Sequence, residues 1–472
     1  MTPAQQDSPA DGPAPSARRH DLVVVGAGTG NALVDDRFAH LDVAVVAEGP
    51  FGGTCLNTGC IPSKMLAVTA DVADAVRDAG RHDADATLHR LRWPDVQRRV
   101  FGRLDAVSGK EEDRRRSSPF VTVHRGTARF TGARRLCVET AEGPLDVTGR
   151  RVVLAAGGRP TVPPAVADSG LPYETSDTVM RTPVPPAHLA VLGGGYIAAE
   201  LAHVFHAAGS RITIIEQREQ LLTDQDEDVS AAFTRAVESR YDLRLGRELT
   251  RVEGAPGALR LVLDDGAVVA ADTLLVAVGR RPNTDRLAVE KGGIACTDEG
   301  LVRVDGQMRT SAEGVWALGD IVTGVPLKHV ANREADVVAH NLLHPGTPRT
   351  MSYDAVPSGV FTRPQIAKVG LTEQDARAQG IDHQVAVHRY EDVAYGWALE
   401  NTEGFCKILA ERSTGRLLGA HLIGPQAAAL LQPLVLAMAI GMTAHEAARR
   451  QLWIHPALTE VVENTLLGLR TE

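Results

Sequence analysis

The fold of this chain is decided by residues 21–31, which read DLVVVGAGTGN. An apolar run that enters a glycine-rich turn predicts a buried strand, a tight turn and the start of a helix. The turn carries Gly26, Gly28 and Gly30. A second apolar run at 43–47 leads to Glu48, twenty residues after Gly28. Glycines let a backbone approach a pyrophosphate, and the acid accepts hydrogen bonds from a ribose. The stretch therefore predicts a dinucleotide-binding unit, although Asn31 stands where the motif has glycine or alanine.

The same pattern recurs in the middle of the chain. An apolar run at 189–192 enters a G-x-G-x-x-A turn formed by Gly193, Gly194, Gly195, Tyr196, Ile197 and Ala198. The next strand is predicted at 211–215 and ends at Glu216, twenty-one residues after Gly195. Two complete units predict two bound dinucleotides, and the obvious pair is FAD with a nicotinamide nucleotide.

Composition limits the class of protein. The chain has 472 residues, of which 44% are hydrophobic, so it is long enough for about three globular domains. A net charge of −9 argues against a nucleic-acid binder, and no apolar run approaches the ~20 residues of a membrane-spanning helix. Residues 1–19 are rich in Pro, Ala and Asp and lack the features of a secretory signal. They are interpreted as a disordered leader on a cytoplasmic protein.

Two of the five cysteines stand apart from the others. Cys137, Cys296 and Cys406 are isolated among apolar neighbours, and the cysteines show no zinc-site spacing, so no metal is expected. Cys55 and Cys60 lie in residues 52–64, GGTCLNTGCIPSK. Five residues of regular helix rise about 7.5 Å, whereas disulfide Cα atoms are rarely more than ~6.8 Å apart. A bond between these sulfurs therefore requires a bent segment, which Gly59 and Pro62 permit. A structural disulfide and half of a metal site are the alternatives; a redox-active pair is favoured.

A candidate base lies near the carboxyl end, in residues 453–460, WIHPALTE. A thiol attacks a disulfide only as a thiolate, and histidine is the natural base near neutral pH. Glu460 is placed to orient the imidazole of His455 and to stabilise its protonated form.

Taken together, these motifs and the ALGD stretch at 317–320 resemble the FAD-dependent pyridine nucleotide-disulfide oxidoreductases over residues 21–470. Four local features are most similar to the mycothione reductase branch: residues 28–31, 177–181, 395–398 and 461–470. The resemblance implies an α/β fold with two Rossmann-like dinucleotide-binding domains and a C-terminal α+β dimerisation domain. The implied boundaries are 20–160 and 283–348 for the FAD domain, 161–282 for the NAD(P) domain and 349–472 for the dimerisation domain.

The resemblance also implies which residues bind the cofactors. Those assigned to FAD are Gly26, Gly28, Gly30, Glu48, Gly53, Thr54, Ala156, Gly157, Gly319 and Asp320. Those assigned to NADH or NADPH are Gly193, Gly195, Tyr196, Ile197, Ala198, Glu216 and Gly279. Lys64 is expected near the flavin and paired with Glu200, and Tyr196 is expected to cover the flavin. In relatives the ribose-binding acid usually stands where this chain has Ala47, so Glu48 departs from the pattern by one residue.

The implied reaction carries a hydride from NAD(P)H through FAD to the Cys55–Cys60 disulfide. Cys60 is the flavin-proximal thiolate, and Cys55 is the interchange thiolate that attacks a small disulfide, mycothiol disulfide in the branch resembled. Family architecture places His455 and Glu460 in the partner's active site, which implies a homodimer with shared sites. Dihydrolipoamide dehydrogenase shares every catalytic motif and is one alternative. A non-catalytic flavin- or nucleotide-sensing protein is the other.

Overall fold

The computed structural model describes residues 18–322, 324–400 and 403–469. Residues 1–17 of the predicted leader and residue 470 lie outside this part of the chain. The sequence predicts a leader through residue 19, whereas Arg18 and Arg19 begin strand β1 (Arg18–Val25) because they pair with Val147 and Thr148 of β6 (Gly143–Leu154). The chain forms two compact units. The first comprises the described residues up to 53 with 108–158 and 282–351, and the second comprises the rest.

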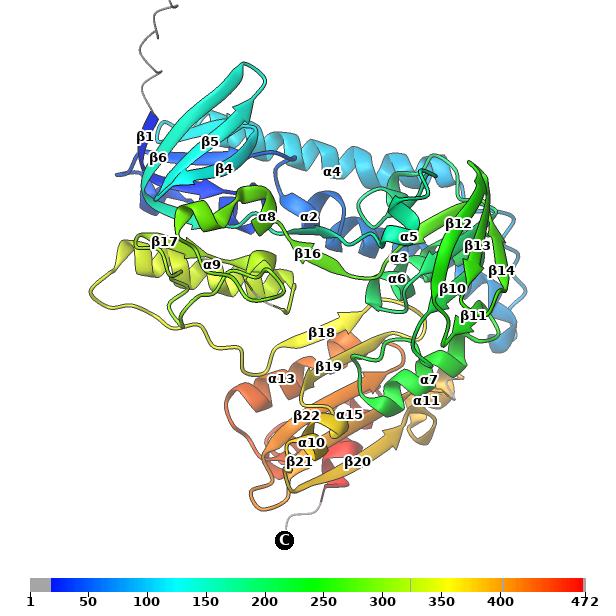
Figure 1. Cartoon of the computed structure of the whole chain (residues 1–472). Coiled ribbons are helices and arrows are strands. Elements are labelled where there is room, and N and C mark those ends of the chain that lie inside the picture. The colour runs from blue at the N-terminus through cyan, green and yellow to red at the C-terminus, as the bar shows by residue number, and fades with distance from the viewer. Residues whose placement is uncertain (1–17, 323, 401–402, 470–472) are drawn as a thin grey trace, which may run out of the picture. The chain divides into compact units, whose positions relative to one another are not determined.

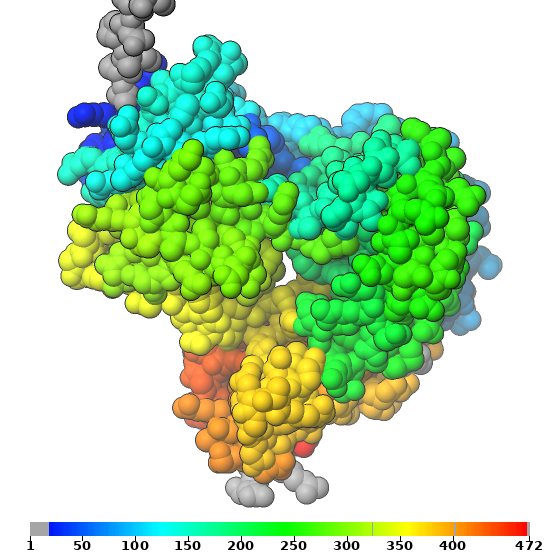
Figure 2. All heavy atoms as spheres, viewed as in Figure 1, coloured from blue at the N-terminus to red at the C-terminus, as the bar shows by residue number. Residues whose placement is uncertain are grey.

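The first unit is built on a sheet in the order β3-β2-β1-β6-β5-β4, with β17 paired to β6 (Figure 1). Its other strands are β2 (Val43–Ala47), β3 (Val121–Arg125), β4 (Thr127–Gly132), β5 (Arg135–Thr140) and β17 (Val315–Ala317). Its helices are α1 (Thr29–Leu33), α8 (Thr284–Leu287) and α9 (Lys328–Leu343). Three segments far apart in sequence thus make one body, and Figure 2 shows their blue, cyan and yellow-green atoms packed against one another.

The second unit contains a parallel sheet in the order β11-β10-β9-β15-β8. Its strands are β8 (Glu174–Thr175), β9 (His188–Leu192), β10 (Arg211–Glu216), β11 (Asp242–Leu245) and β15 (Thr273–Val276). A three-stranded antiparallel sheet follows, with β12 (Leu249–Ala255), β13 (Ala258–Leu263) and β14 (Val268–Ala271). Helices α5 (Pro164–Ala167), α6 (Tyr196–Ala207) and α7 (Glu227–Val237) belong to this region, and β7 (Gly158–Pro160) pairs with β16 (Arg280–Pro282). The strands predicted at 189–192 and 211–215 are β9 and β10.

A further, five-stranded sheet of this unit is antiparallel, in the order β18-β19-β22-β21-β20. Its strands are β18 (Pro357–Val360), β19 (Ile366–Gly370), β20 (His383–Arg389), β21 (Phe405–Glu411) and β22 (Leu417–Ile423). The accompanying helices are α10 (Glu373–Ala378), α11 (Ala394–Ala398), α12 (Ala427–Leu430), α13 (Gln432–Ala439), α14 (Ala444–Arg449) and α15 (Thr459–Leu467). One apolar core joins the parallel sheet to this five-stranded antiparallel sheet, because Ile212 of β10 and Ile423 of β22 belong to the same buried cluster.

Three further helices are α2 (Gly53–Asn57), α3 (Cys60–Arg77) and α4 (Trp93–Arg116). Apart from Gly53, α2 and α3 belong to the second unit, and the boundary between the units falls within α4, after residue 107. The short 3-10 helices are η1 (Asp36–Phe38), η2 (Ala79–His82), η3 (Val179–Arg181), η4 (Val289–Gly292), η5 (Gly319–Ile321) and η6 (Tyr390–Asp392). Within the described ranges, none of the helices has the length and apolar character needed to cross a membrane. The predicted α/β fold class is confirmed.

Candidate functional site

The first glycine turn leaves no room for a side chain at its first position. Gly26 has a φ of +123°, and a Cβ there would lie 2.2 Å from the carbonyl oxygen of Ala155. The Gly26 N–H donates to Val46 O at 2.9 Å, which fixes the turn between β1 and β2. Only glycine satisfies both conditions.

The second turn has the same geometry. Gly193 has a φ of +110°, and a Cβ there would lie 2.5 Å from the carbonyl oxygen of Ala277. Its N–H donates to Ile215 O at 2.8 Å, as that of Gly26 does to Val46. The two turns are therefore equivalent glycine cradles at the carboxyl ends of parallel strands, and each fits a dinucleotide pyrophosphate.

Asn31 departs from the motif for a reason the structure shows. Its side chain is 3% exposed and donates from Nδ2 to Oε1 of Glu111 at 2.8 Å. Its backbone oxygen accepts a hydrogen bond from Arg115 Nη2 at 2.6 Å. Glu111 and Arg115 lie on α4, so Asn31 ties the helix behind the first turn to α4.

Other candidate FAD residues are contacted by side chains from the last segment of the first unit, residues 282–351. Asn283 Nδ2 donates to Ala156 O at 2.8 Å, and the buried carboxylate of Glu334 accepts from Gly319 N at 2.6 Å. Glu48 lies just after β2 and pairs with Arg286 at 2.5 Å. Glu334 thus holds Gly319, and the sequence motifs did not predict the supporting residues Asn283, Arg286 and Glu334.

The second glycine turn, at residues 193–195, lies against an acidic side chain. A Cβ on Gly194 would lie 2.9 Å from both Cγ and Oε2 of Glu216, the last residue of β10. Glu216 Oε1 accepts from the backbone N–H of Arg218 at 2.9 Å. The Arg218 guanidinium donates to Thr223 Oγ1 at 3.0 Å. The carboxylate therefore faces the glycine turn while Arg218 is held by another partner.

The two cysteines lie on either side of a break between two helices. Cys55 belongs to α2, which ends at Asn57, and Cys60 is the first residue of α3. A Cβ on Gly59 would lie 2.9 Å from Thr54 O, so the chain folds back closely at this point. Cys55 is half-buried and Cys60 is exposed. The irregular segment that a bond between the sulfurs requires is present.

One turn along α3, a lysine faces a buried carboxylate. Lys64 Nζ lies 2.7 Å from both carboxylate oxygens of Glu200, which is 5% exposed on α6. Glu200 also accepts from Ser63 Oγ at 3.3 Å and from Phe361 N at 3.0 Å. Lys64 Nζ lies 4.9 Å from the centre of the Phe361 ring. Ser63 and Phe361 were not expected from the sequence, because neither carries a recognisable motif.

The histidine and glutamate of the carboxyl-terminal motif form a pair. His455 Nδ1 lies 2.7 Å from Glu460 Oε1, and Glu460 Oε2 accepts from Ala457 N at 3.3 Å. The hydrogen bond with His455 lowers the pKa of Glu460, so this carboxylate remains ionised. The imidazole side chain is 74% exposed and that of Glu460 is 19% exposed. With Nδ1 bound to a carboxylate, Nε2 is the nitrogen directed to exchange a proton.

The remaining candidate residues occupy turns and element ends. Gly28 and Gly195 immediately precede α1 and α6, Gly30 lies on α1, Gly53 begins α2, Gly157 follows β6, Asp320 lies on η5, Tyr196, Ile197 and Ala198 begin α6, and Gly279 precedes β16. Among the described residues, no group of three or more His, Cys, Asp and Glu side chains is suited to hold a metal ion.

Comparison with known proteins covers nearly the whole chain. Residues 20–335 match the pyridine nucleotide-disulphide oxidoreductase family, and residues 356–466 match the dimerisation domain of that family. The chain is 48% identical to mycothione reductase from Mycobacterium tuberculosis, over 96% of this chain and 99% of the relative. It is 32% identical to dihydrolipoyl dehydrogenase from Geobacillus stearothermophilus, over 93% and 94% of the two chains.

Solved structures agree with this assignment. The Cu(II) complex of the HOCl-induced flavoprotein disulfide reductase RclA from Escherichia coli superposes with a TM-score of 0.86. The two sequences are 27% identical, and the match covers 96% of this chain and 100% of the other.

Proposed function

Because this chain belongs to the pyridine nucleotide-disulphide oxidoreductase family, we propose that its substrate is mycothiol disulfide, which it reduces to two molecules of mycothiol. The disulfide-reductase class rests on the cysteine pair at the α2–α3 break together with two equivalent glycine cradles. The choice of substrate rests on 48% identity to mycothione reductase over 96% of the chain.

The enzyme uses FAD and a nicotinamide nucleotide, and these cofactors supply the two electrons that open the Cys55–Cys60 bond. The cradles fit them, since a Cβ at Gly26 or Gly193 would collide with backbone. Gly26, Gly28 and Gly30 would hold the FAD pyrophosphate, and Gly193 and Gly195 would hold that of the nucleotide.

Lys64 would place a fixed positive charge near the flavin. Its partner Glu200 is buried and makes four hydrogen bonds, which restrain the ammonium group. A buried carboxylate that lost its lysine would be left uncompensated. The pair therefore holds one orientation of Lys64.

In the substrate half-reaction, the Cys55 thiolate attacks one sulfur of the small disulfide and releases the first thiol, which takes its proton from His455. The Cys60 thiolate then attacks Cys55 Sγ in the mixed disulfide and re-forms the Cys55–Cys60 bond, and the second thiolate leaves and takes a proton from solvent. Two electrons leave the dithiol and two thiols are produced. Glu460 keeps the imidazole oriented and stabilises its protonated form.

We place the exposed His455–Glu460 pair in a homodimer, where it serves the partner's cysteines. The match of residues 356–466 to a dimerisation domain supports this arrangement. We place the enzyme in the cytoplasm, where an exposed dithiol is kept reduced.

The deciding experiment compares three disulfides with the FAD-loaded enzyme and each nicotinamide nucleotide. We expect the highest kcat/KM with mycothiol disulfide and little turnover of glutathione disulfide or lipoamide. Cys55→Ser, which retains the fold and the cofactor cradles, is the matched inactive control. Fast turnover of lipoamide alone would make the protein a dihydrolipoamide dehydrogenase. No turnover of any disulfide by a flavin-loaded enzyme would favour the sensor alternative.

A further inference from the structure

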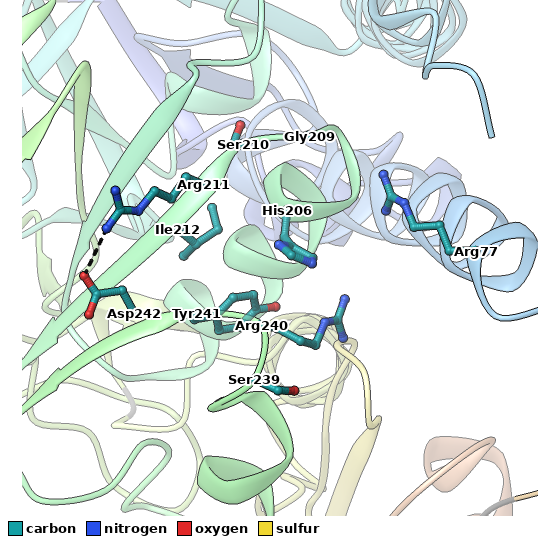
Figure 3. A pocket seen from close by; sticks show the side chains of 10 residues that line it. All are labelled: Arg77, His206, Gly209, Ser210, Arg211, Ile212, Ser239, Arg240, Tyr241 and Asp242. Carbon is teal, nitrogen blue, oxygen red and sulfur yellow. Dashed lines mark ion pairs between the residues drawn. The ribbon is translucent and has the colours of Figure 1, made fainter. Parts of the chain in front are cut away.

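A pocket of about 650 Å³ opens at the amino ends of β10 and β11 (Figure 3). Its polar lining includes Arg77, His206, Arg211, Ser239, Arg240 and Tyr241. Nucleotides bind at the carboxyl ends of such strands. β10 spans six residues from Arg211 to Glu216, so the pocket lies about 17 Å from the acid at the nucleotide turn. It is therefore separate from the predicted nucleotide site.

Two guanidinium groups of the pocket share one buried carboxylate. Arg77 Nη1 lies 3.0 Å from Asp74 Oδ1, and Arg240 Nη2 lies 2.7 Å from Asp74 Oδ2. Each arginine also donates to a backbone oxygen, Arg77 to Ala207 at 2.7 Å and Arg240 to Arg363 at 3.2 Å. A guanidinium has five N–H donors. Three donors of each arginine thus have no partner among the residues that the structure describes.

The lining of the pocket carries more positive than negative charge. Arg77 and Arg240 both face Asp74, and Arg363, which pairs with Asp78 at 2.5 Å, lies 3.9 Å from the same carboxylate. The lining itself holds three arginines, Arg77, Arg211 and Arg240, and one aspartate, Asp242. Such an excess, with unused donors, favours an anionic group.

Two further side chains contribute polar atoms to the pocket. Tyr241 is 5% exposed, and its hydroxyl is buried without a hydrogen-bond partner in the described chain. Burial raises the pKa of Tyr241 to about 12, so the hydroxyl is a donor at neutral pH. The His206 ring lies 5.5 Å from the Tyr241 ring, in an edge-on arrangement. Burial lowers the pKa of His206, and the nearby charges of Arg240 and Arg77 lower it further.

We propose that this pocket binds a small molecule that carries a phosphate group. Guanidinium groups match phosphate oxygens in paired hydrogen bonds, and a phosphate offers more acceptor oxygens than a carboxylate. Arg77 and Arg240 supply the charge, and the Tyr241 hydroxyl gains its missing partner. The Arg211–Asp242 pair, with an N–O distance of 3.7 Å, lines the opposite side and suits hydroxyl groups of the same molecule. The ligand is thus a small phosphate ester, and free phosphate is the minimal form.

The test uses the flavin-loaded enzyme saturated with NAD⁺, so that the second glycine cradle is occupied. Inorganic phosphate, glycerol 3-phosphate and glycerol are titrated by calorimetry at constant ionic strength. We expect saturable binding of both phosphates, tighter for the ester, and none of glycerol. In a parallel NMR titration the bound anion should raise the pKa of His206, a readout independent of activity.

Three variants make the test specific. Arg240→Gln should weaken binding by about ten- to a hundredfold, the effect of losing a charged hydrogen bond. Ser239 is exposed, so Ser239→Glu should fold normally and abolish binding by like-charge repulsion. Arg260→Gln, at an exposed arginine of β13 outside the pocket, is the matched control and should bind as the native protein does. Absence of saturable binding, or unchanged binding in both Arg240→Gln and Ser239→Glu, would overturn the proposal.

Discussion

Replacing Glu216 by alanine should change which nicotinamide nucleotide the enzyme prefers. The carboxylate of Glu216 faces the glycine turn, because a Cβ on Gly194 would lie 2.9 Å from its Oε2. An acid at this position accepts hydrogen bonds from the ribose hydroxyls of NADH and repels the 2′-phosphate of NADPH. Arg218 is the nearby cation that would offset the repulsion, but its guanidinium is held by Thr223 at 3.0 Å. We therefore expect the native enzyme to prefer NADH.

The size of the preference follows from the position of Glu216. Two unit charges about 4 Å apart repel by about 1 kcal/mol in water and about 4 kcal/mol at the dielectric typical of a protein surface. Glu216 is half-buried, so about 2 kcal/mol is expected, which corresponds to roughly thirtyfold in kcat/KM. The substitution also removes charged hydrogen bonds to the ribose, each worth about 1.5–3 kcal/mol. The ratio of kcat/KM for NADH to that for NADPH should therefore fall by about two orders of magnitude.

The assay is steady-state reduction of one disulfide at saturation, with each nucleotide varied in turn. Glu253→Ala is the matched control, because this exposed carboxylate lies on β12, in another sheet of the same unit, and should leave the ratio unchanged. A strong preference of the native enzyme for NADPH, unaltered in Glu216→Ala, would refute the reasoning.

The two cysteines should differ in the flavin spectrum. Cys55→Ser should show a long-wavelength charge-transfer band before reduction, because Cys60 is left as a thiolate, and Cys60→Ser should show none; exchanged spectra would reverse the two roles. His455→Ala should slow turnover by about 10²–10⁴-fold. Mixing it with Cys55→Ser should recover activity in hybrid dimers, and verified subunit exchange without recovery would count against shared sites. Burial lowers the pKa of His124 to about 4, below about 6.5 in the unfolded chain. Neutral His124 thus favours the fold above pH 6.5, and up to about 3 kcal/mol of the free energy of unfolding is lost as pH falls toward 4. In His124→Asn, the free energy of unfolding measured in urea should fall less steeply between pH 6.5 and pH 4. An unchanged slope would contradict the role given to His124.

The elements that sequence patterns predicted best are the parallel strands. The apolar run at 43–47 is β2 without a change of boundary, and 211–215 is β10 shortened by one residue. Such strands are buried on both faces, so most of their residues are apolar and the run marks their extent. The assembly of the first unit from three separate segments has no such signal, because it depends on packing between residues far apart in sequence.

The residues of the candidate site also fall into two groups, those with a local sequence signal and those without one. The glycine turns and the α2–α3 break are local, and their spacing alone indicated them. Lys64 and Glu200 are 136 residues apart, and only the resemblance to a family suggested their pairing. Asn31 looked like a defect in the motif, yet it forms a hydrogen bond to Glu111, 80 residues away.

The arginine-lined pocket could not have been predicted from the sequence. Arg77 ends α3 and Arg240 follows α7, and nothing in the spacing of either residue distinguishes it from an ordinary surface arginine. They become a site only because the buried carboxylate of Asp74 draws both guanidinium groups to one point. A buried carboxylate requires compensation, but one arginine would have been enough. The second arginine is therefore informative only in the structure. Ser239→Glu, at an exposed position that leaves both arginines on Asp74, is the substitution that separates a binding role from a purely structural one.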